Sequence, residues 1–280
     1  MSSTAAINRP IARVYRTEVD NTLTARAIKQ VVHELTPPAE LSCAACQAYE
    51  LNLCRAATAT QWGAGRSDTL QHIEQTARSV PARRIICREQ DLHDSVPIIC
   101  SGWAASIVML SDGSRQILSF LLPGDLVSTA LLFEPRPHCL VEAVTDVNYR
   151  TFRRSELKAI LLKYPDLFDR LSKAWIEEKD RADQLIVDLG RRTADERIAR
   201  LMLNLAERLG RRGMFRTAAA PAIEMDFPLR QHHIADATGL TPVHVSKVLS
   251  EFRRSGLIRI SDRSLTILDP PGFRRVAQMR

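Results

Sequence analysis

The sequence lacks the features that mark several classes of protein. None of its apolar runs approaches the length of a membrane span. Its first ten residues, MSSTAAINRP, lack the apolar core of a secretory signal. It also contains no glycine-rich phosphate loop and no motif for a catalytic nucleophile. We therefore expect a cytoplasmic protein that has no membrane partner and is not an enzyme.

The charge of the 280-residue chain is unevenly distributed, which its net value of +7 conceals. Residues 190–280 contain 17 basic and 9 acidic side chains, whereas residues 1–189 are close to neutral. A chain of this length suggests about two domains, and the excess positive charge falls in the second. Positive charge gathered in this way is suited to the phosphate backbone of double-stranded DNA.

Residues 229–254 predict two short amphipathic helices with a tight turn between them. Gly239 can adopt a positive φ in that turn at little cost. Thr241 can cap the second helix, and Pro242 suits its first turn, where a backbone N–H has no helical partner. The pattern is typical of a helix-turn-helix whose second helix reads DNA. The alternative is an ordinary helical hairpin with a solvated basic face.

The exposed side of the second helix and its cap supply the candidate DNA contacts. These residues are Thr241, Val243, His244, Ser246, Lys247, Ser250, Arg253 and Arg254. Residues 256–260 and 264–268 then alternate like two short strands about a polar turn. A hairpin in that place predicts a winged helix whose wing lies against the DNA backbone.

A strand-rich region precedes the long helices. Short apolar strands are expected over residues 84–88, 96–100, 104–110, 116–122, 139–144 and 147–152. Residues 111–114 contain an Asp-Gly pair, which is a strong hairpin signal. Many short strands at close spacing indicate a small antiparallel barrel or roll. Before them, residues 66–79 are expected to form a helix with Leu70, Ile73 and Ala77 on one side.

A long helix is expected over residues 166–189, after a short one over 154–163. Apolar residues recur along it at intervals of three and four, which suits pairing with a second copy of the chain. The candidate dimer residues are Leu167, Leu171, Trp175, Leu185 and Leu189. The alternative is packing against the chain's own strands. Gly190 and Thr193 are expected to separate this helix from the next, over 194–209.

These elements predict an α+β fold in four parts. Residues 1–65 form an N-terminal extension with a cysteine cluster, and residues 66–163 form an antiparallel β-roll. Residues 164–190 form the dimerisation helix, and residues 191–280 form the winged helix-turn-helix domain.

The order of roll, long helix and winged helix resembles the CRP/FNR family of bacterial transcription regulators, most closely its FNR/FixK-like branch. The most specific pieces are Leu122-Pro-Gly-Asp125, Arg192-Thr-Ala-Asp-Glu-Arg-Ile-Ala-Arg200 and residues 234–249. The resemblance implies a sensor domain of the cyclic-nucleotide-binding fold. It also implies a homodimer, RNA polymerase as a partner, and a nearly palindromic DNA site with half-sites about 34 Å apart.

The six cysteines include a cluster spaced Cys-x2-Cys-x7-Cys, formed by Cys43, Cys46 and Cys54. Three thiolates so close can hold most of a zinc or [4Fe–4S] centre, which needs a fourth ligand. The alternative is three thiols in a loop without metal. The FNR branch holds a [4Fe–4S] cluster with three such cysteines and one from the roll, so the resemblance implies sensing of oxygen or redox state.

The fourth cluster ligand and the cyclic-nucleotide site depart from the family's pattern. Arg150 stands where the roll's ligand cysteine is expected, so we choose Cys139 instead, because it begins a strand beside a proline-rich turn and should be accessible. Cys87 and Cys100 lie within apolar strands and are expected to be core thiols. Residues 124–139 lack the family's arrangement of a glycine–glutamate pair and an arginine followed by a small residue, since Arg136 lies between Pro135 and Pro137, so we expect no cyclic nucleotide to bind.

The recognition helix also departs from the FNR branch, which presents glutamate, serine and arginine to the bases. The corresponding residues here are Val243, Ser246 and Lys247. Lysine can contact guanine but lacks the bidentate fork of arginine, so a different half-site is expected. The leading hypothesis is a dimeric, sequence-specific transcription regulator. The alternative is an iron–sulfur or thiol redox protein without specific DNA readout.

Overall fold

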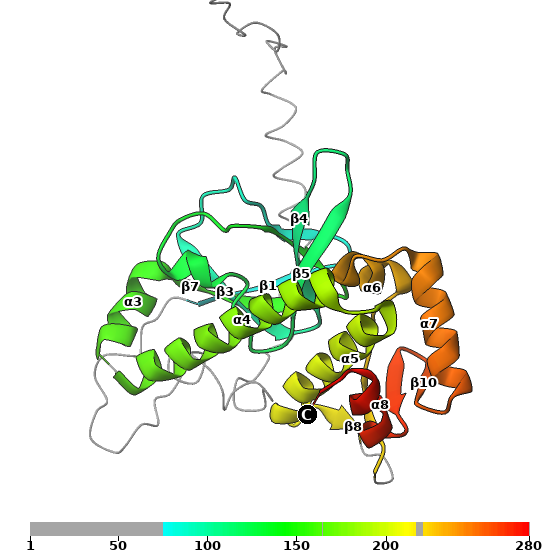
Figure 1. Ribbon diagram of the computed structural model, residues 1–280. Helices are drawn as coiled ribbons and strands as arrows, with labels where there is room; N and C mark the ends of the chain where they lie inside the picture. Colours follow the sequence, from blue (N-terminus) through cyan, green and yellow to red (C-terminus); the bar gives the residue numbers. More distant parts are fainter. Residues whose placement is uncertain (1–74, 164, 217–220, 280) are drawn as a thin grey trace, which may run out of the picture. The chain divides into compact units, whose positions relative to one another are not determined.

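The computed structural model describes residues 75–163, 165–216 and 221–279 (Figure 1), all within the compact unit Pro37–Arg280. Among these residues, no helix is both long and apolar enough to cross a membrane.

Two antiparallel sheets form the β-roll that the short apolar runs predict. One has the strand order β1-β7-β3 and the other β2-β6-β4-β5. The strands are β1 (Gln75–Val80), β2 (Ile85–Cys87), β3 (Ser95–Ser101), β4 (Ala104–Met109), β5 (Arg115–Leu121), β6 (Leu140–Ala143) and β7 (Val147–Arg153). The predicted Asp-Gly hairpin is confirmed: it joins β4 to β5, where Asp112 Oδ1 accepts a hydrogen bond from the backbone N–H of Ser114 at 2.8 Å.

The helix expected over residues 66–79 is wrong in its described part. Residues 75–80 form β1, which pairs with β7 from Gln75 opposite Phe152 to Val80 opposite Val147. The sequence QTARSV has no clear alternation of apolar residues, and β1 lies at an edge of its sheet. The pairing with β7 therefore decides its conformation. Residues 66–74 lie outside the described part of the chain.

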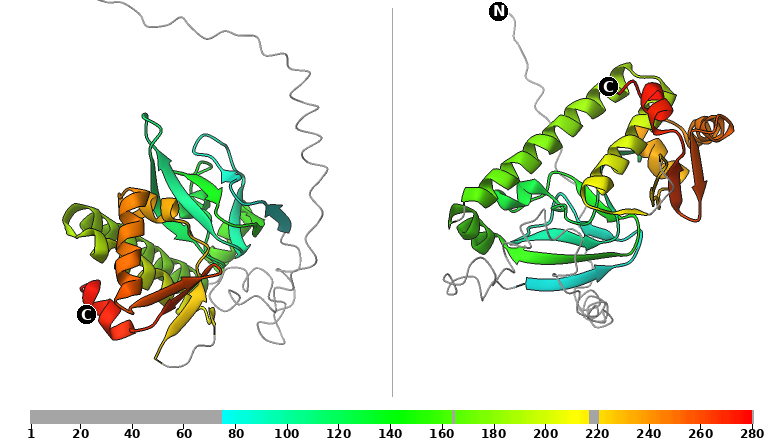
Figure 2. Two further views of the ribbon diagram at one scale, coloured as in Figure 1. Left: turned by 90° about the vertical axis from the view of Figure 1, so that its right-hand side faces the viewer. Right: turned by 90° about the horizontal axis from the view of Figure 1, so that it is seen from below.

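Two helices follow the roll, α3 (Arg154–Lys163) and the long α4 (Pro165–Arg191) (Figure 2). The first confirms the predicted limits, but the second continues through Gly190, which was expected to break it. The break falls instead at the start of α5 (Ala194–Arg211), where the Thr193 hydroxyl accepts from the backbone N–H of Glu196 and the Glu196 carboxylate accepts from that of Thr193. This reciprocal capping box starts the new helix without a glycine.

The C-terminal elements form the predicted winged helix. They are α5, β8 (Phe215–Arg216), β9 (Ile223–Asp226), α6 (Gln231–Thr238), α7 (Pro242–Arg254), β10 (Ile258–Ser261), β11 (Ser264–Ile267) and α8 (Pro270–Val276). Strands β10 and β11 make the wing hairpin, and β11 pairs on its other side with β9. The α+β fold expected from the sequence is thereby confirmed.

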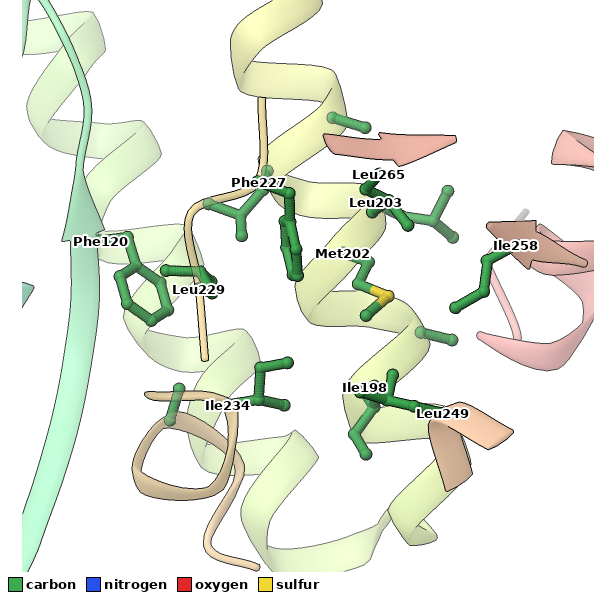
Figure 3. Packing of buried hydrophobic residues seen from close by; sticks show 14 of the residues in the cluster. Phe120, Ile198, Met202, Leu203, Phe227, Leu229, Ile234, Leu249, Ile258 and Leu265 are labelled. Carbon is green, nitrogen blue, oxygen red and sulfur yellow. The ribbon is translucent and has the colours of Figure 1, made fainter. Parts of the chain in front are cut away.

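One apolar cluster runs from the roll into the winged helix. Figure 3 shows Met202 of α5 among the side chains of α6, α7 and the wing, with Phe120 of β5 facing Leu229. Met202 and Phe227 are almost fully buried there. Because β5 and α6 also pack together, burial of apolar surface joins the strands of the roll to the winged helix.

Candidate nucleic-acid interface

Helix α7 divides its side chains between a core face and an open face. Val245, Val248, Leu249 and Phe252 are buried at intervals of three and four residues. The hydroxyl of Thr241 accepts a hydrogen bond from the backbone N–H of His244 at 3.2 Å and caps the helix, as expected. The core face fixes the rotation of the helix about its own axis, so the opposite face is presented outward.

The predicted DNA contacts lie on that open side of α7 or at its cap. Thr241, Val243, His244, Lys247, Ser250, Arg253 and Arg254 are exposed, and Ser246 is half-buried. The hydroxyl of Ser250 donates to the backbone carbonyl of Ser246 at 2.8 Å. The face therefore combines side chains that can contact bases with arginines at the C-terminal end of the helix that can contact phosphate.

The turn between α6 and α7 is held from both sides. Gly239 has φ 65°, the left-handed conformation expected for it. A Cβ at this glycine would lie 3.2 Å from Cδ2 of Leu189 at the end of α4. Arg197 of α5 donates to the carbonyl oxygen of Thr238 at 3.1 Å. Both α4 and α5 thus contact the turn that orients the recognition helix.

His233 caps α6, a role that sequence reasoning missed. Its Nδ1 accepts a hydrogen bond from the backbone N–H of Arg230 at 3.1 Å. Burial, and then the neighbouring charge of His232, lower the pKa of His233 to about 4. The ring is therefore neutral at pH 7 and supports the helix rather than DNA. No sequence signal revealed it, because a histidine three residues after an arginine is not a recognisable cap.

A charged network joins α4 to α5 within the motif Arg192-Thr-Ala-Asp-Glu-Arg-Ile-Ala-Arg200. Asp188 of α4 lies 2.9 Å from Nε of Arg192 and 2.8 Å from Nε of Arg200. Arg200 also donates to Oε1 of Gln184 at 2.6 Å. This motif therefore fixes the angle between α4 and α5, and hence the place of the helices that pack on α5.

Polar contacts also join the roll to α6. Arg115 of β5 lies 3.3 Å from Glu142 of β6 and 3.7 Å from Asp236 of α6. The side-chain amide of Gln116 lies 3.5 Å from the carbonyl oxygen of Ala237. These contacts and the shared apolar core make α6 part of the boundary with the roll.

Cys139 is buried, so the accessible thiol expected at this position is wrong. Its Sγ lies 2.7 Å from Oγ of Ser106, and burial raises the pKa of the thiol. It directly precedes β6, which pairs with β4 from Leu140 opposite Ile107, and this pairing carries its side chain into the roll. Cys87, expected to be a core thiol, is almost fully buried. Burial and the nearby Cys139 raise the pKa of Cys87 to about 12.

The remaining cysteine predictions concern ligands of a metal centre. Cys43, Cys46 and Cys54 lie outside the described residues. Cys100 is half-buried in β3, and Arg150 is half-buried in β7. Across the described ranges, no group of three or more His, Cys, Asp or Glu side chains could hold a metal ion. Cys139 and Cys87 are buried and their pKa values are raised, whereas Cys100 is half-buried.

The predicted dimer residues lie in different environments on α4. Leu167 and Leu171 are buried against the chain's own roll. Trp175 stacks on Phe133 with the ring centroids 5.5 Å apart. Leu185 and Leu189 are half-buried and line a cavity of about 340 Å³ between α4, α5 and β5. The exposed apolar residues of α4 are Phe168, Trp175, Ile176, Ile186 and Val187.

An open, basic recognition helix in a winged helix, joined to a β-roll, defines the class of DNA-binding proteins with an attached sensor-type domain. Residues 196–276 match the family model described as a Crp-like helix-turn-helix domain, and residues 77–164 match the cyclic nucleotide-binding domain. The chain belongs to the CRP/FNR family of transcription regulators.

Individual relatives agree with this assignment. The chain is 30% identical to the nitrogen fixation regulation protein FixK of Bradyrhizobium diazoefficiens, over 72% of this chain and 82% of FixK. It is 31% identical to the transcriptional activator FnrL of Cereibacter sphaeroides, over 72% of this chain and 81% of FnrL. The solved structure of FixK2 from Bradyrhizobium japonicum is similar with a TM-score of 0.63 and 27% identity, over 73% of this chain and 98% of that one.

We expect acid to destabilise the protein through His233. Its pKa is lower in the folded chain than the usual 6.5, so the unfolded chain binds the extra proton first. The stability that the neutral ring contributes is complete above pH 6.5 and is lost as the pH falls towards 4, on the order of 3 kcal/mol in total. Thermal unfolding of His233→Gln should depend less on pH across this window, because glutamine can cap α6 without ionising. The exposed control His244→Gln should behave like the parent. An equal pH dependence in His233→Gln would contradict this account.

We also expect Cys87 and Cys139 to resist alkylation in the folded protein. Only the thiolate reacts, and burial both hides these groups and disfavours ionisation. Iodoacetamide at neutral pH should modify them about tenfold more slowly, or slower still, than in urea-unfolded protein. Peptide mass spectrometry measures each site separately. Equal rates for Cys139 in the folded and unfolded chain would show that this thiol is available after all.

Proposed function

We propose that this chain is a cytoplasmic, dimeric regulator that binds a two-half-site DNA sequence through α7. The observation that carries the proposal is the open face of α7, whose rotation is fixed by a buried face and by contacts to its turn from α4 and α5. Lys247, Ser246 and Val243 are assigned to the base edges, and Arg253 and Arg254 to phosphates. The wing hairpin lies against the backbone beside them.

The dimer forms through α4 in this proposal. A solvent-exposed helix face with Phe168, Ile176 and Ile186 is costly in water, and a second copy of the helix can cover it. The side that holds Leu167 and Leu171 already packs against the roll. One helix therefore serves both of the roles that its sequence allows, on different faces. In this arrangement residues 66–163 are the sensor part, 164–190 the dimer helix and 191–280 the DNA-binding part.

RNA polymerase is the proposed partner at a promoter, since relatives of this chain are named as transcriptional activators. No step of the proposal passes through a [4Fe–4S] cluster, because Cys43, Cys46 and Cys54 lie outside the described residues. The alternative of a thiol redox protein requires reactive thiolates. Cys87 and Cys139 do not supply them, because each has a raised pKa in a buried setting; the cluster of Cys43, Cys46 and Cys54, on which that alternative is based, lies outside the described residues.

The DNA-binding proposal is tested by first selecting the preferred duplex from a random library. Lys247→Ala should weaken binding to the selected duplex by about 1–3 kcal/mol and binding to random DNA by less, because it removes a base contact. The control Lys158→Ala removes an exposed lysine of α3 in the roll and should change neither affinity. Quantitative mobility-shift titration measures both. An equal loss on selected and random DNA would remove Lys247 from base readout.

The dimer proposal is tested at Ile186, which is 70% exposed in the single chain. Ile186→Glu should place a charge in the contact between the two α4 helices and shift the sedimentation coefficient towards that of the monomer. Leu92→Glu is the matched control, since Leu92 is also 69% exposed but lies in the loop between β2 and β3. An unchanged dimer in Ile186→Glu would mean that the contact lies on another surface.

A further inference from the structure

The turn that follows β5 places one carboxylate at the boundary between the roll and α5. In the segment Leu122-Pro-Gly-Asp125, Gly124 adopts φ 98°, which favours glycine. Oδ2 of Asp125 accepts a hydrogen bond from the backbone N–H of Leu122 at 2.7 Å, which closes the turn. The side chain is thereby fixed by its own turn before any other element contacts it.

Two arginines from the end of α5 meet this carboxylate. Nη2 of Arg208 lies 2.7 Å from Oδ2 of Asp125, and Nη2 of Arg212 lies 2.5 Å from Oδ1. Arg212 also donates through Nη1 to the carbonyl oxygen of Pro123 at 2.6 Å. The three charged side chains are 6%, 12% and 17% exposed for Arg208, Arg212 and Asp125. At such burial, salt screens an ion pair much less than it does at the surface.

Among the three side chains that contact one another here, two are positive and one is negative. Burial raises the pKa of Asp125 on its own account, but the charges of Arg208 and Arg212 outweigh it and lower the pKa overall. Burial lowers the pKa of Arg208 to about 10, so its guanidinium is still charged at neutral pH. Arg208 and Arg212 thus share the carboxylate of Asp125, while the charges of Glu178 of α4 and of Arg181 also act on Arg208. Nε of Arg208 is buried and has no hydrogen-bond partner among the described residues.

Helix α5 carries the recognition elements with it. Ile198, Met202 and Leu205 belong to the same buried cluster as the apolar faces of α6 and α7 (Figure 3). A group that fixes the end of α5 against the roll therefore also fixes α6 and α7. This link runs directly from β5 to α5 and does not pass through α4.

We propose that Asp125 is a positioning residue for DNA binding: through Arg208 and Arg212 it holds α5, and with it α7, at one orientation to the roll. This inference rests on the proposed function for its effect on DNA. In a dimer, the orientation of each α7 to its own roll sets the distance between the two recognition helices. The charge group therefore governs which half-site spacing the protein accepts.

Because two positive side chains contact one negative one, substitutions of the three residues should have different effects. Asp125→Asn keeps a side-chain oxygen for the N–H of Leu122 but leaves Arg208 and Arg212 without the carboxylate that they both contact, which is destabilising. Arg212→Gln leaves one cation with one anion. The triple variant Asp125→Asn, Arg208→Gln, Arg212→Gln removes all three contacting charges and with them both ion pairs. Comparing these variants separates positioning from the mere cost of unpaired charge.

The test uses the full chain and duplexes with the selected half-sites at their preferred spacing, with one base pair added, and with one half-site alone. Binding both half-sites at once gives an advantage of about 10²–10⁴ over one half-site. In Asp125→Asn this advantage should fall by about tenfold or more, and the preference for the original spacing should be lost. Affinity for a single half-site should stay within about twofold of the parent. Arg212→Gln should keep the spacing preference.

The triple variant decides between the two roles. We expect its thermal stability to recover relative to Asp125→Asn while its spacing preference stays lost, because stability needs only charge balance and positioning needs the ion pairs. Recovery of both would overturn the positioning role. Retention of the spacing preference in Asp125→Asn would overturn it as well.

A measurement without DNA keeps this inference separate from the proposed function. Hydrogen–deuterium exchange of the backbone amides of α6 and β5, which pack together, should be faster in Asp125→Asn than in Arg212→Gln. Failure of the parent chain to select any DNA sequence would refute the proposed function alone. Exchange rates in Asp125→Asn equal to those of the parent would refute the positioning role of Asp125 alone.

Discussion

The placement of α5 against the roll depends on one buried carboxylate, which forms ion pairs with two arginines at once. Asp125 is held by its own turn and faces Arg208 and Arg212 from a helix more than eighty residues further along the chain. Two guanidinium groups cannot be buried together without an anion, since their mutual repulsion and lost hydration would cost several kcal/mol. The end of α5 can therefore lie in this place only while the turn after β5 supplies its charge. The apolar cluster beside it buries surface but is not directional, whereas the ion pairs fix the orientation of α5.

The segments that resemble the CRP/FNR family most specifically turn out to be joints between elements. Leu122-Pro-Gly-Asp125 connects the roll to α5, and the segment from Arg192 to Arg200 connects α4 to α5 through Asp188. Both use a short acidic side chain shared by two arginines. Such a joint needs few residues, because ion pairs with fixed hydrogen-bond geometry set an angle that apolar contacts leave free.

The sequence predicted what local physics decides and missed what distant contacts decide. The winged helix was predictable because Gly239, Thr241 and the spacing of Val245, Val248 and Leu249 each act within a few residues. The edge strand β1 was missed because QTARSV has no pattern of its own and takes its conformation from β7. Gly190 was expected to end α4, but the capping box at Thr193 decides where the next helix starts. The pairing of Asp125 with Arg208 had no signal in the sequence, since nothing local relates two charges 83 residues apart.

Helix α4 and Cys139 show a second limit of prediction from sequence, which concerns the side of a helix or sheet on which a residue lies and what covers it. Apolar positions at helical spacing show that α4 must be covered, but they do not say by what. The structure assigns Leu167 and Leu171 to the roll and leaves Phe168, Ile176 and Ile186 open. The same holds for Cys139 just before β6, because a shift of one residue in the register of that strand would move its side chains to the other face of the sheet. Its hydrogen bond to Ser106 places the thiol inside the roll, although the proline-rich turn before it suggests the surface. The sequence therefore shows whether a residue is apolar or reactive. Which groups it contacts is decided by the register and packing of its helix or strand.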